Sequence, residues 1–169
     1  MLKDLTERAE DVIAKAMAYN PAATNFAQEL KKIVDEYNNA HEKATIEKAL
    51  QDILKLIKNI DEEGRKYERE DFDNQKQYVV YQMLISDKKL SAADVKEVKS
   101  VAKELLKRLQ ILTAGIDDWR NKNEAKALVR KEIRDTLFSL LPDDLNSDEA
   151  RAAFEEKVYN YYYQLPDAA

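Results

Sequence analysis

Apolar residues recur along nearly the whole chain at spacings of three and four, which is the period of one face of an α-helix. Only two glycines, Gly64 and Gly115, and three prolines interrupt the 169 residues. No Asn-Gly or Asp-Gly pair, a strong hairpin signal, occurs. A charged fraction of 36% beside a hydrophobic fraction of 44% is typical of helical proteins. The sequence therefore predicts an all-α fold with no sheet.

Helix breakers and caps divide the apolar stripes into about seven helices. Ser91-Ala-Ala-Asp94 is a capping-box variant and marks the most distinct helix start. Thr45 is expected to cap a long helix that reaches about Glu70, and Trp119 to lead a helix that Pro142 ends. The apolar segment 78–84 has the length of a strand or a helix, and its context favours a helix. We expect a compact irregular bundle, because the stripes stop before the heptads of a long coiled coil accumulate.

Length and cysteine content bound the organisation of the chain. A chain of 169 residues is near the usual size of one domain, so we expect residues 1–169 to form a single helical domain. The sequence has no cysteine, which removes disulfides and thiolate metal sites and favours the cytoplasm. Acids near the N-terminus and the lack of a long apolar run predict neither a secretory signal nor a membrane span.

Catalytic patterns are missing from the sequence. His41 is the only histidine, so a zinc site or a Ser-His triad is not expected, and we interpret it as a surface residue. The acid pairs Glu62-Glu63 and Asp143-Asp144 are interpreted as solvated helix ends. Gly64 and Gly115 lie too far apart for a phosphate-binding loop. We therefore predict no catalytic residue, no metal and no cofactor in this domain; an unrecognised enzyme would need a pocket with perturbed ionisable groups.

Positive charge gathers in two stripes, although the net charge is -5. Four cations follow at intervals of four between Lys122 and Arg134, and a second series runs from Lys96 to Lys107. One interpretation is two solvated helix faces, partly paired with Glu97, Glu104, Glu124 and Asp135. The other is a DNA-binding groove, formed if the two stripes align. The candidate DNA-binding residues are Lys99, Lys103, Lys107, Arg120, Lys122, Lys126, Arg130 and Arg134.

Aromatic residues form a second candidate surface near the C-terminal end. Core packing and an interaction surface are both open interpretations for aromatic side chains at these positions. Three consecutive tyrosines cannot all point inward from one helix, so at least one is expected at the surface. The candidate interface residues are Trp119, Tyr159, Tyr161, Tyr162 and Tyr163.

Three segments of the chain resemble a known family. They are residues 71–84, residues 98–109 and the stretch from Asp118-Trp119 through Ala127-Leu-Val-Arg130 to Leu141-Pro142. In pattern and order they are similar to the C-terminal region of type I restriction R subunits. The family's helix with aromatic and aliphatic positions corresponds here to Tyr81 and Leu84. Its capped helix corresponds to the one that begins at Ser91, and its Asp-Trp pair with a following arginine-bearing helix corresponds to Trp119 and Arg130. The resemblance covers roughly residues 30–163.

The resemblance implies a role as the non-catalytic C-terminal part of a larger multidomain motor subunit. The parent subunit it implies is an ATP-dependent DNA translocase and endonuclease, so ATP and Mg belong to that subunit and not to this domain. The implied partners are the rest of the R subunit, the methyltransferase core of modification and specificity subunits, and duplex DNA. The alternative is a helical protein-protein scaffold that makes no DNA contact.

Overall fold

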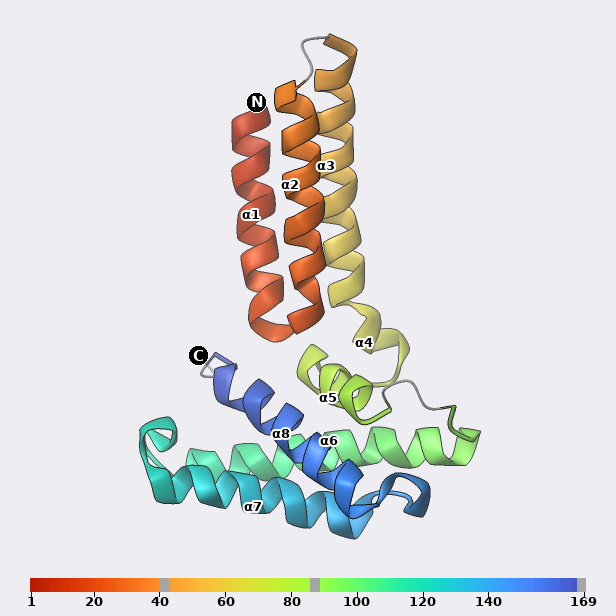
Figure 1. The fold of residues 1–169 in the computed structure, drawn as a ribbon, viewed down its shortest axis with the longest axis vertical. Coiled ribbons are helices and arrows are strands. Elements are labelled where there is room, and N and C mark those ends of the chain that lie inside the picture. Colours follow the sequence, from red (N-terminus) through yellow and green to blue (C-terminus); the bar gives the residue numbers. More distant parts are fainter. Residues whose placement is uncertain (40–42, 86–88, 167–169) are drawn as a thin grey trace. The chain divides into compact units, whose positions relative to one another are not determined.

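Amphipathic stripes become helices throughout the computed structural model, which describes residues 1–39, 43–85 and 89–166 (Figure 1). Over those ranges the chain forms eight α-helices and three short 3-10 helices and no strand, which confirms the predicted all-α class. The α-helices are α1 (Leu2–Tyr19), α2 (Thr24–Asn39), α3 (Lys43–Gly64), α4 (Lys66–Arg69), α5 (Gln75–Ile85), α6 (Ala92–Ala114), α7 (Asn123–Leu140) and α8 (Asp148–Gln164). The 3-10 helices are η1 (Pro21–Ala23), η2 (Trp119–Asn121) and η3 (Asp143–Leu145).

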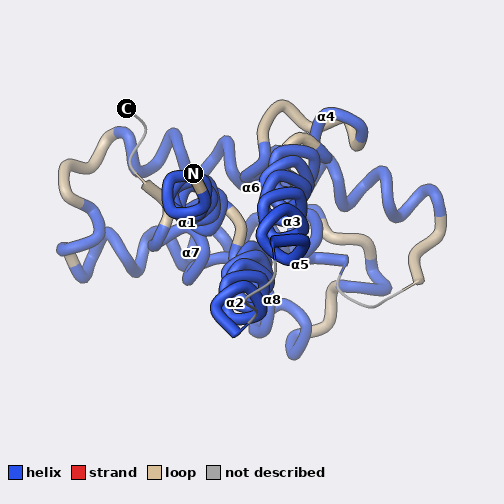
Figure 2. Tube along the Cα trace, turned by 90° about the horizontal axis from the view of Figure 1, so that it is seen from above, coloured by secondary structure: helices blue, strands red, loops and turns tan. Residues whose placement is uncertain are grey.

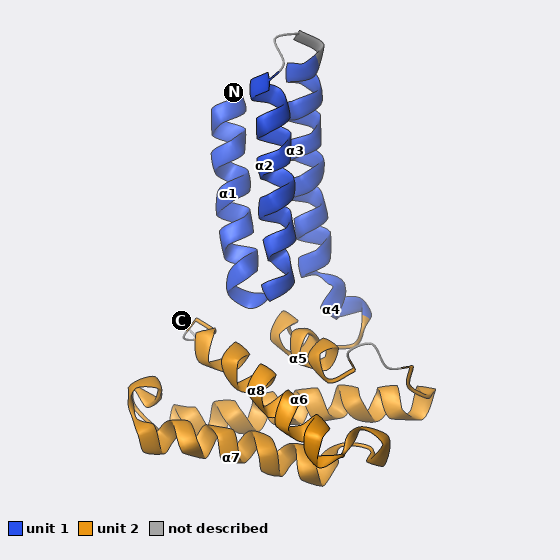
Figure 3. Cartoon of the chain, in the orientation of Figure 1, with its two compact units in different colours: residues 1–69 blue, residues 70–169 orange. Residues whose placement is uncertain are grey.

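The chain divides into two compact units, residues 1–69 and residues 70–169 (Figure 3). Unit 1 holds α1 to α4, and unit 2 holds α5 to α8. Each unit is described by itself below. That residues 1–169 form a single domain within a larger subunit stays a prediction.

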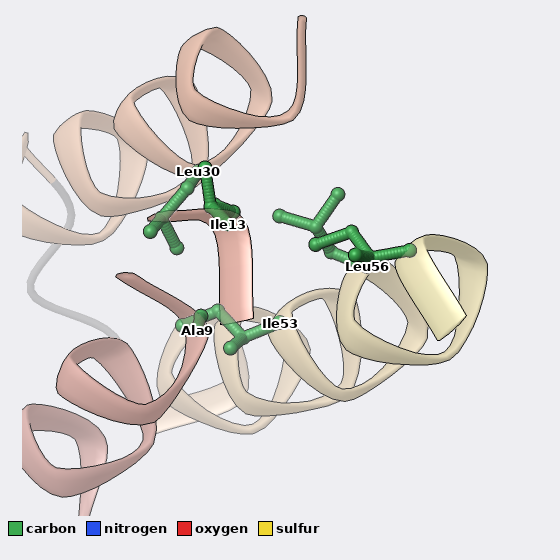
Figure 4. Packing of buried hydrophobic residues seen from close by; sticks show 6 residues of the cluster. Ala9, Ile13, Leu30, Ile53 and Leu56 are labelled. Carbon is green, nitrogen blue, oxygen red and sulfur yellow. The ribbon is translucent and has the colours of Figure 1, made fainter. Parts of the chain in front are cut away.

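Unit 1 is built on three helices that lie side by side, and Figure 2 shows α1, α2 and α3 nearly end-on. Helix α3 packs against both α1 and α2. Ala9 and Ile13 of α1, Leu30 of α2, and Ile53 and Leu56 of α3 converge in the core, each at most 5% exposed (Figure 4). Burial of such side chains supplies most of the stability that short helices lack in isolation.

In unit 2, each of the four helices packs against two others, so that the contacts form a ring. Helix α5 packs on α6, α6 on α7, α7 on α8, and α8 returns to α5. Leu105 and Leu109 of α6 meet a core that includes Ile133 and Leu137 of α7, and all four side chains are fully buried. The segment 75–85 is the helix α5, as its context predicted.

Side-chain caps and a proline mark several helix ends, and those at Ser91 and Pro142 are as predicted. Ser91 Oγ accepts a hydrogen bond from the Asp94 amide at 3.1 Å and caps α6. Ser147 Oγ does the same for the Ala150 amide and caps α8. Helix α7 ends at Leu140, two residues before Pro142. Gly115 is the C-terminal cap of α6, but in the right-handed region with φ -86°, so this cap does not use the conformation that favours glycine.

Three predicted details are different in the structure. Helix α3 begins at Lys43, so Thr45 lies inside the helix and is not its cap. The expected helix to about Glu70 ends at Gly64, and the short α4 follows it, which accounts for eight helices where about seven were expected. Trp119 lies in η2, and α7 begins only at Asn123. His41, interpreted as a surface residue, lies outside the described residues.

Candidate functional site

Two of the predicted cations of α6, Lys99 and Lys103, contact the segment that precedes α5. Lys99 Nζ lies 3.0 Å from Glu70 Oε2 and also donates to the Glu70 carbonyl at 3.2 Å. The same ammonium lies 5.8 Å from the ring centroid of Phe72, and Lys103 Nζ lies 5.6 Å from it. A cation over an aromatic face is attracted by the ring quadrupole. Lys99 and Lys103 therefore help to hold unit 2 together.

The arginines of the α7 stripe face α8. Arg130 Nη1 donates to Glu156 Oε2 at 3.0 Å, and its Cζ lies 3.8 Å from the ring centroid of Tyr159. Arg134 donates from Nε and Nη2 to the two carboxylate oxygens of Glu155, each at 3.1 Å. This fork-to-fork geometry is the strongest form of an arginine-carboxylate pair. Both arginines are therefore already paired with carboxylates of α8.

These pairs shift two ionisation equilibria. The hydrogen bond from Arg130 is the main cause that lowers the pKa of Glu156, and a hydrogen bond from Asn160 adds to it. The hydrogen bond to Glu155 raises the pKa of Arg134. Each shift favours the charged form of its group.

The ion pairs differ from those expected at the sequence level. Glu104 pairs with Arg108 at 2.9 Å, and Asp135 pairs with Lys131 at 3.8 Å, so neither acid neutralises a stripe cation by an ion pair. The acids that pair with the α7 arginines lie 21 and 26 residues further along the chain. Sequence reasoning missed them, because no local spacing connects α7 to α8.

The two stripes occupy different faces of the α6–α7 pair. Arg108 of α6 reaches Thr136 of α7 at 3.5 Å, and Thr136 also contacts Glu132, so this face of α7 meets α6. Residues two apart on a helix are separated by about 200° around its axis. Arg130 and Arg134 therefore point away from the side of α7 that faces Arg108. The contacts do not bring the stripes into one groove.

Three of the predicted cations are unpaired within the part of the chain that the structure describes. The Lys107, Lys122 and Lys126 side chains make no hydrogen bond or ion pair with any residue that the structure describes. Lys107 lines a polar cavity of about 510 Å³ together with Lys103 and residues at the start of α5. Lys122 precedes the first residue of α7. Lysine ammonium groups are common contacts of a phosphate backbone.

Arg120 serves as a clamp on the end of α8. Its Nε donates to the Tyr163 carbonyl and its Nη2 to the Leu165 carbonyl, both at 2.8 Å. The last carbonyls of a helix lack intrahelical partners, and a cation satisfies them. The Arg120 guanidinium also lies over the Trp119 ring, 4.9 Å from its centroid. This residue, predicted to bind DNA, is engaged in an internal contact.

The turn that carries this clamp has an unusual backbone. Asp118 has φ 52° in the left-handed region, which Asp tolerates better than most residues. Its Oδ1 accepts a hydrogen bond from Asn121 Nδ2 at 2.7 Å. Trp119 then enters the core and stacks on Tyr162 with a centroid distance of 5.6 Å.

Four of the five predicted interface aromatics are buried within unit 2. Trp119, Tyr159, Tyr161 and Tyr162 are between 2% and 7% exposed, whereas Tyr163 is 40% exposed. Burial favours core packing for the first four. The expectation that at least one of the consecutive tyrosines reaches the surface is confirmed by Tyr163, which alone of the five offers a large surface to a partner.

The described residues meet the requirements neither of a metal site nor of a membrane-spanning helix. Over residues 1–39, 43–85 and 89–166, no group of three or more His, Cys, Asp or Glu side chains is arranged to hold a metal ion. No helix in the same ranges is long and apolar enough to span a membrane.

Comparison with protein families identifies the class to which this helical chain belongs. Residues 2–157 match the family described as type I restriction enzyme HindI endonuclease subunit-like, C-terminal. The chain belongs to this family of C-terminal domains of type I restriction endonuclease subunits. The predicted resemblance is confirmed, and the match begins at residue 2 instead of about residue 30 and ends at residue 157 instead of about residue 163. No curated protein and no solved structure matches the chain.

Proposed function

We propose that this chain is a non-catalytic assembly module that docks a type I restriction endonuclease subunit onto its methyltransferase core of modification and specificity subunits. Membership in a family of C-terminal domains of that subunit supports the proposal. ATP and Mg would serve the motor part of the parent subunit, and the complex would act in the cytoplasm.

The observation that favours assembly over DNA tracking is the pairing of the α7 arginines. Arg130 and Arg134 contact Glu156 and Glu155 on α8. To bind a phosphate, each arginine has to leave a carboxylate that it already contacts, which offsets part of the gain. A surface of paired charges instead suits a protein interface, in which charge arrangement sets orientation and partner choice.

A second candidate function, DNA contact, is favoured by the three unpaired lysines. Lys107, Lys122 and Lys126 need not break an ion pair with a described residue to meet a phosphate. Each phosphate contact that is lost lowers the dependence of log K on log salt by about one. A contact through these lysines would therefore be weak and strongly salt-dependent.

The test is a titration of the chain against the methyltransferase complex and, separately, against duplex DNA, each at low and at physiological salt. Assembly predicts binding to the methyltransferase complex that weakens less steeply with salt than DNA binding does, because a protein interface does not release the condensed counterions of a phosphate backbone. No binding to that complex at either salt concentration would refute the assembly function.

Two matched triple variants test whether the unpaired lysines contact DNA. If the unpaired lysines contact DNA, Lys107→Ala, Lys122→Ala and Lys126→Ala together reduce the salt slope by about three. The control changes Arg120, Arg130 and Arg134 to Lys, which keeps the charge but removes planar pairing. A salt slope that the first variant leaves unchanged would exclude the DNA contact.

A further inference from the structure

An open groove runs between α1 and α2 in unit 1. Two cavities of about 410 and 470 Å³ lie along it, and all their lining residues belong to α1 and α2. They share Thr6, Glu10 and Val34, so they are consecutive parts of one groove. From Leu2 to Met17 the groove follows α1 for about 22 Å, at 1.5 Å per residue.

The floor of the groove is apolar and shallow. Ile13 and Leu30 reach through it from the core of unit 1. Ala14 and Ala27 are exposed and small, so another backbone can approach closely, and Met17 is 38% exposed. Methionine adapts its shape to different apolar partners. A linear apolar groove between two side-by-side helices has the shape that accepts a further helix.

The rim of the groove carries an excess of acid. Glu7 is neutralised in part by Lys3, with 3.9 Å between Nζ and Oε1. Glu10 and Asp35, at the middle of the groove, make no side-chain hydrogen bond or ion pair within the described residues, and neither does Lys31. Two unpaired carboxylates against one unpaired ammonium leave this part of the rim negative.

We propose that the α1–α2 groove binds one amphipathic α-helix of a partner protein, with an apolar face bordered by lysine or arginine. The apolar face covers Ala14, Met17 and Ala27, and the basic border meets Glu10 and Asp35. About four turns of helix fill the length of the groove. The inference deepens the proposed assembly function, since it names the surface and the chemistry of its partner.

The test uses the full chain and two labelled helical peptides of about 18 residues. Both peptides carry leucine at helical spacing along one face; one borders this face with lysine and the other with glutamate. Fluorescence anisotropy should show the lysine peptide binding roughly five- to tenfold more tightly, from two exposed ion pairs. Amide shifts in the NMR spectrum should map to α1 and α2.

A charge-reversed chain provides the decisive comparison. Glu10→Lys with Asp35→Lys should invert the preference, so that the glutamate peptide binds more tightly. Asp11→Lys with Glu36→Lys makes the same change in net charge at exposed positions that do not line the groove and should leave the preference as it was. Ala14→Gln, which fills the floor, should weaken both peptides.

Three outcomes would overturn the inference: equal binding of the two peptides, amide shifts outside α1 and α2, or a dimer of the chain that Ala14→Gln converts to a monomer. The last would assign the groove to a second copy. Binding to the methyltransferase complex is measured in parallel. If the chain prefers the lysine peptide but does not bind the methyltransferase complex, only the assembly function is refuted. If it binds the methyltransferase complex but shows no preference between the peptides, only the groove is refuted.

Discussion

The Arg130 guanidinium lies over the ring of Tyr159, with 3.8 Å between Cζ and the ring centroid, while its Nη1 holds Glu156. Glu156 and Tyr159 are three residues apart on α8 and so share one face of that helix. One arginine of α7 thus contacts α8 through a charge and a ring at once. At Arg130, the predicted basic stripe therefore joins α7 to α8.

Replacement of Arg130 should separate these two contributions. We expect Arg130→Ala to lower the free energy of unfolding by roughly 1 kcal/mol through loss of the stacked guanidinium. Arg130→Lys keeps the charge but not the planar stack, so its effect should be intermediate. Urea unfolding followed by circular dichroism measures both. Equal stability of the wild type and Arg130→Ala would show that the stack contributes nothing.

The pair should also make stability depend on pH. The pKa of Glu156 is lowered in the folded state by Arg130, so the folded state binds its proton less readily than the unfolded state. The stabilisation is therefore present above the ordinary pKa of a glutamate and is lost as pH falls through the lowered value. We expect the stability difference between wild type and Arg130→Ala to shrink in acid. A carboxyl NMR titration should show the pKa of Glu156 rising in that variant, and Arg134→Ala is the matched control.

The clamp at the end of α8 makes a local prediction. Arg120→Ala removes two hydrogen bonds from a charged donor, worth about 1–2 kcal/mol together at a partly exposed site. We expect amide hydrogen exchange to accelerate in the last turn of α8, including the Leu165 amide that bonds to the Tyr162 carbonyl. Arg120→Lys cannot reach both carbonyls in the same geometry and should restore only part of the protection. Unchanged exchange would mean that the clamp is not needed.

Core variants test whether the two units unfold separately. Ile53→Ala empties part of the unit 1 core and Leu105→Ala part of the unit 2 core, each at a cost of about 2–5 kcal/mol. We expect Ile53→Ala to accelerate amide exchange in α1 to α3 and Leu105→Ala in α6 to α8. Exchange that accelerates in both units with either variant would instead support the predicted single domain.

Some helix ends were predictable from a signal that acts within one turn. Ser91 bonds to an amide three residues away, and Pro142 lacks an amide hydrogen, so both effects are local. Thr45 has the same capping chemistry but lies within α3, because the helix starts earlier at Lys43. Residue type alone does not decide which of several nearby positions becomes the first of a helix.

The candidate site was predictable only in part. The spacing of four correctly places Arg130 and Arg134 on one face of α7, since both meet α8. Their partners depend on how α7 and α8 pack, which the local pattern does not contain. Trp119 is a similar case: its burial depends on the stack with Tyr162, 43 residues further along the chain.

The Arg120 clamp closes residues 120–165 into a non-covalent loop. Tension applied to the chain just after α8 therefore reaches Arg120 and the Trp119 turn before it can unwind that helix. The C-terminal end of α8 therefore transmits mechanical load to the turn that precedes α7, and it does not unwind as a free helix end would.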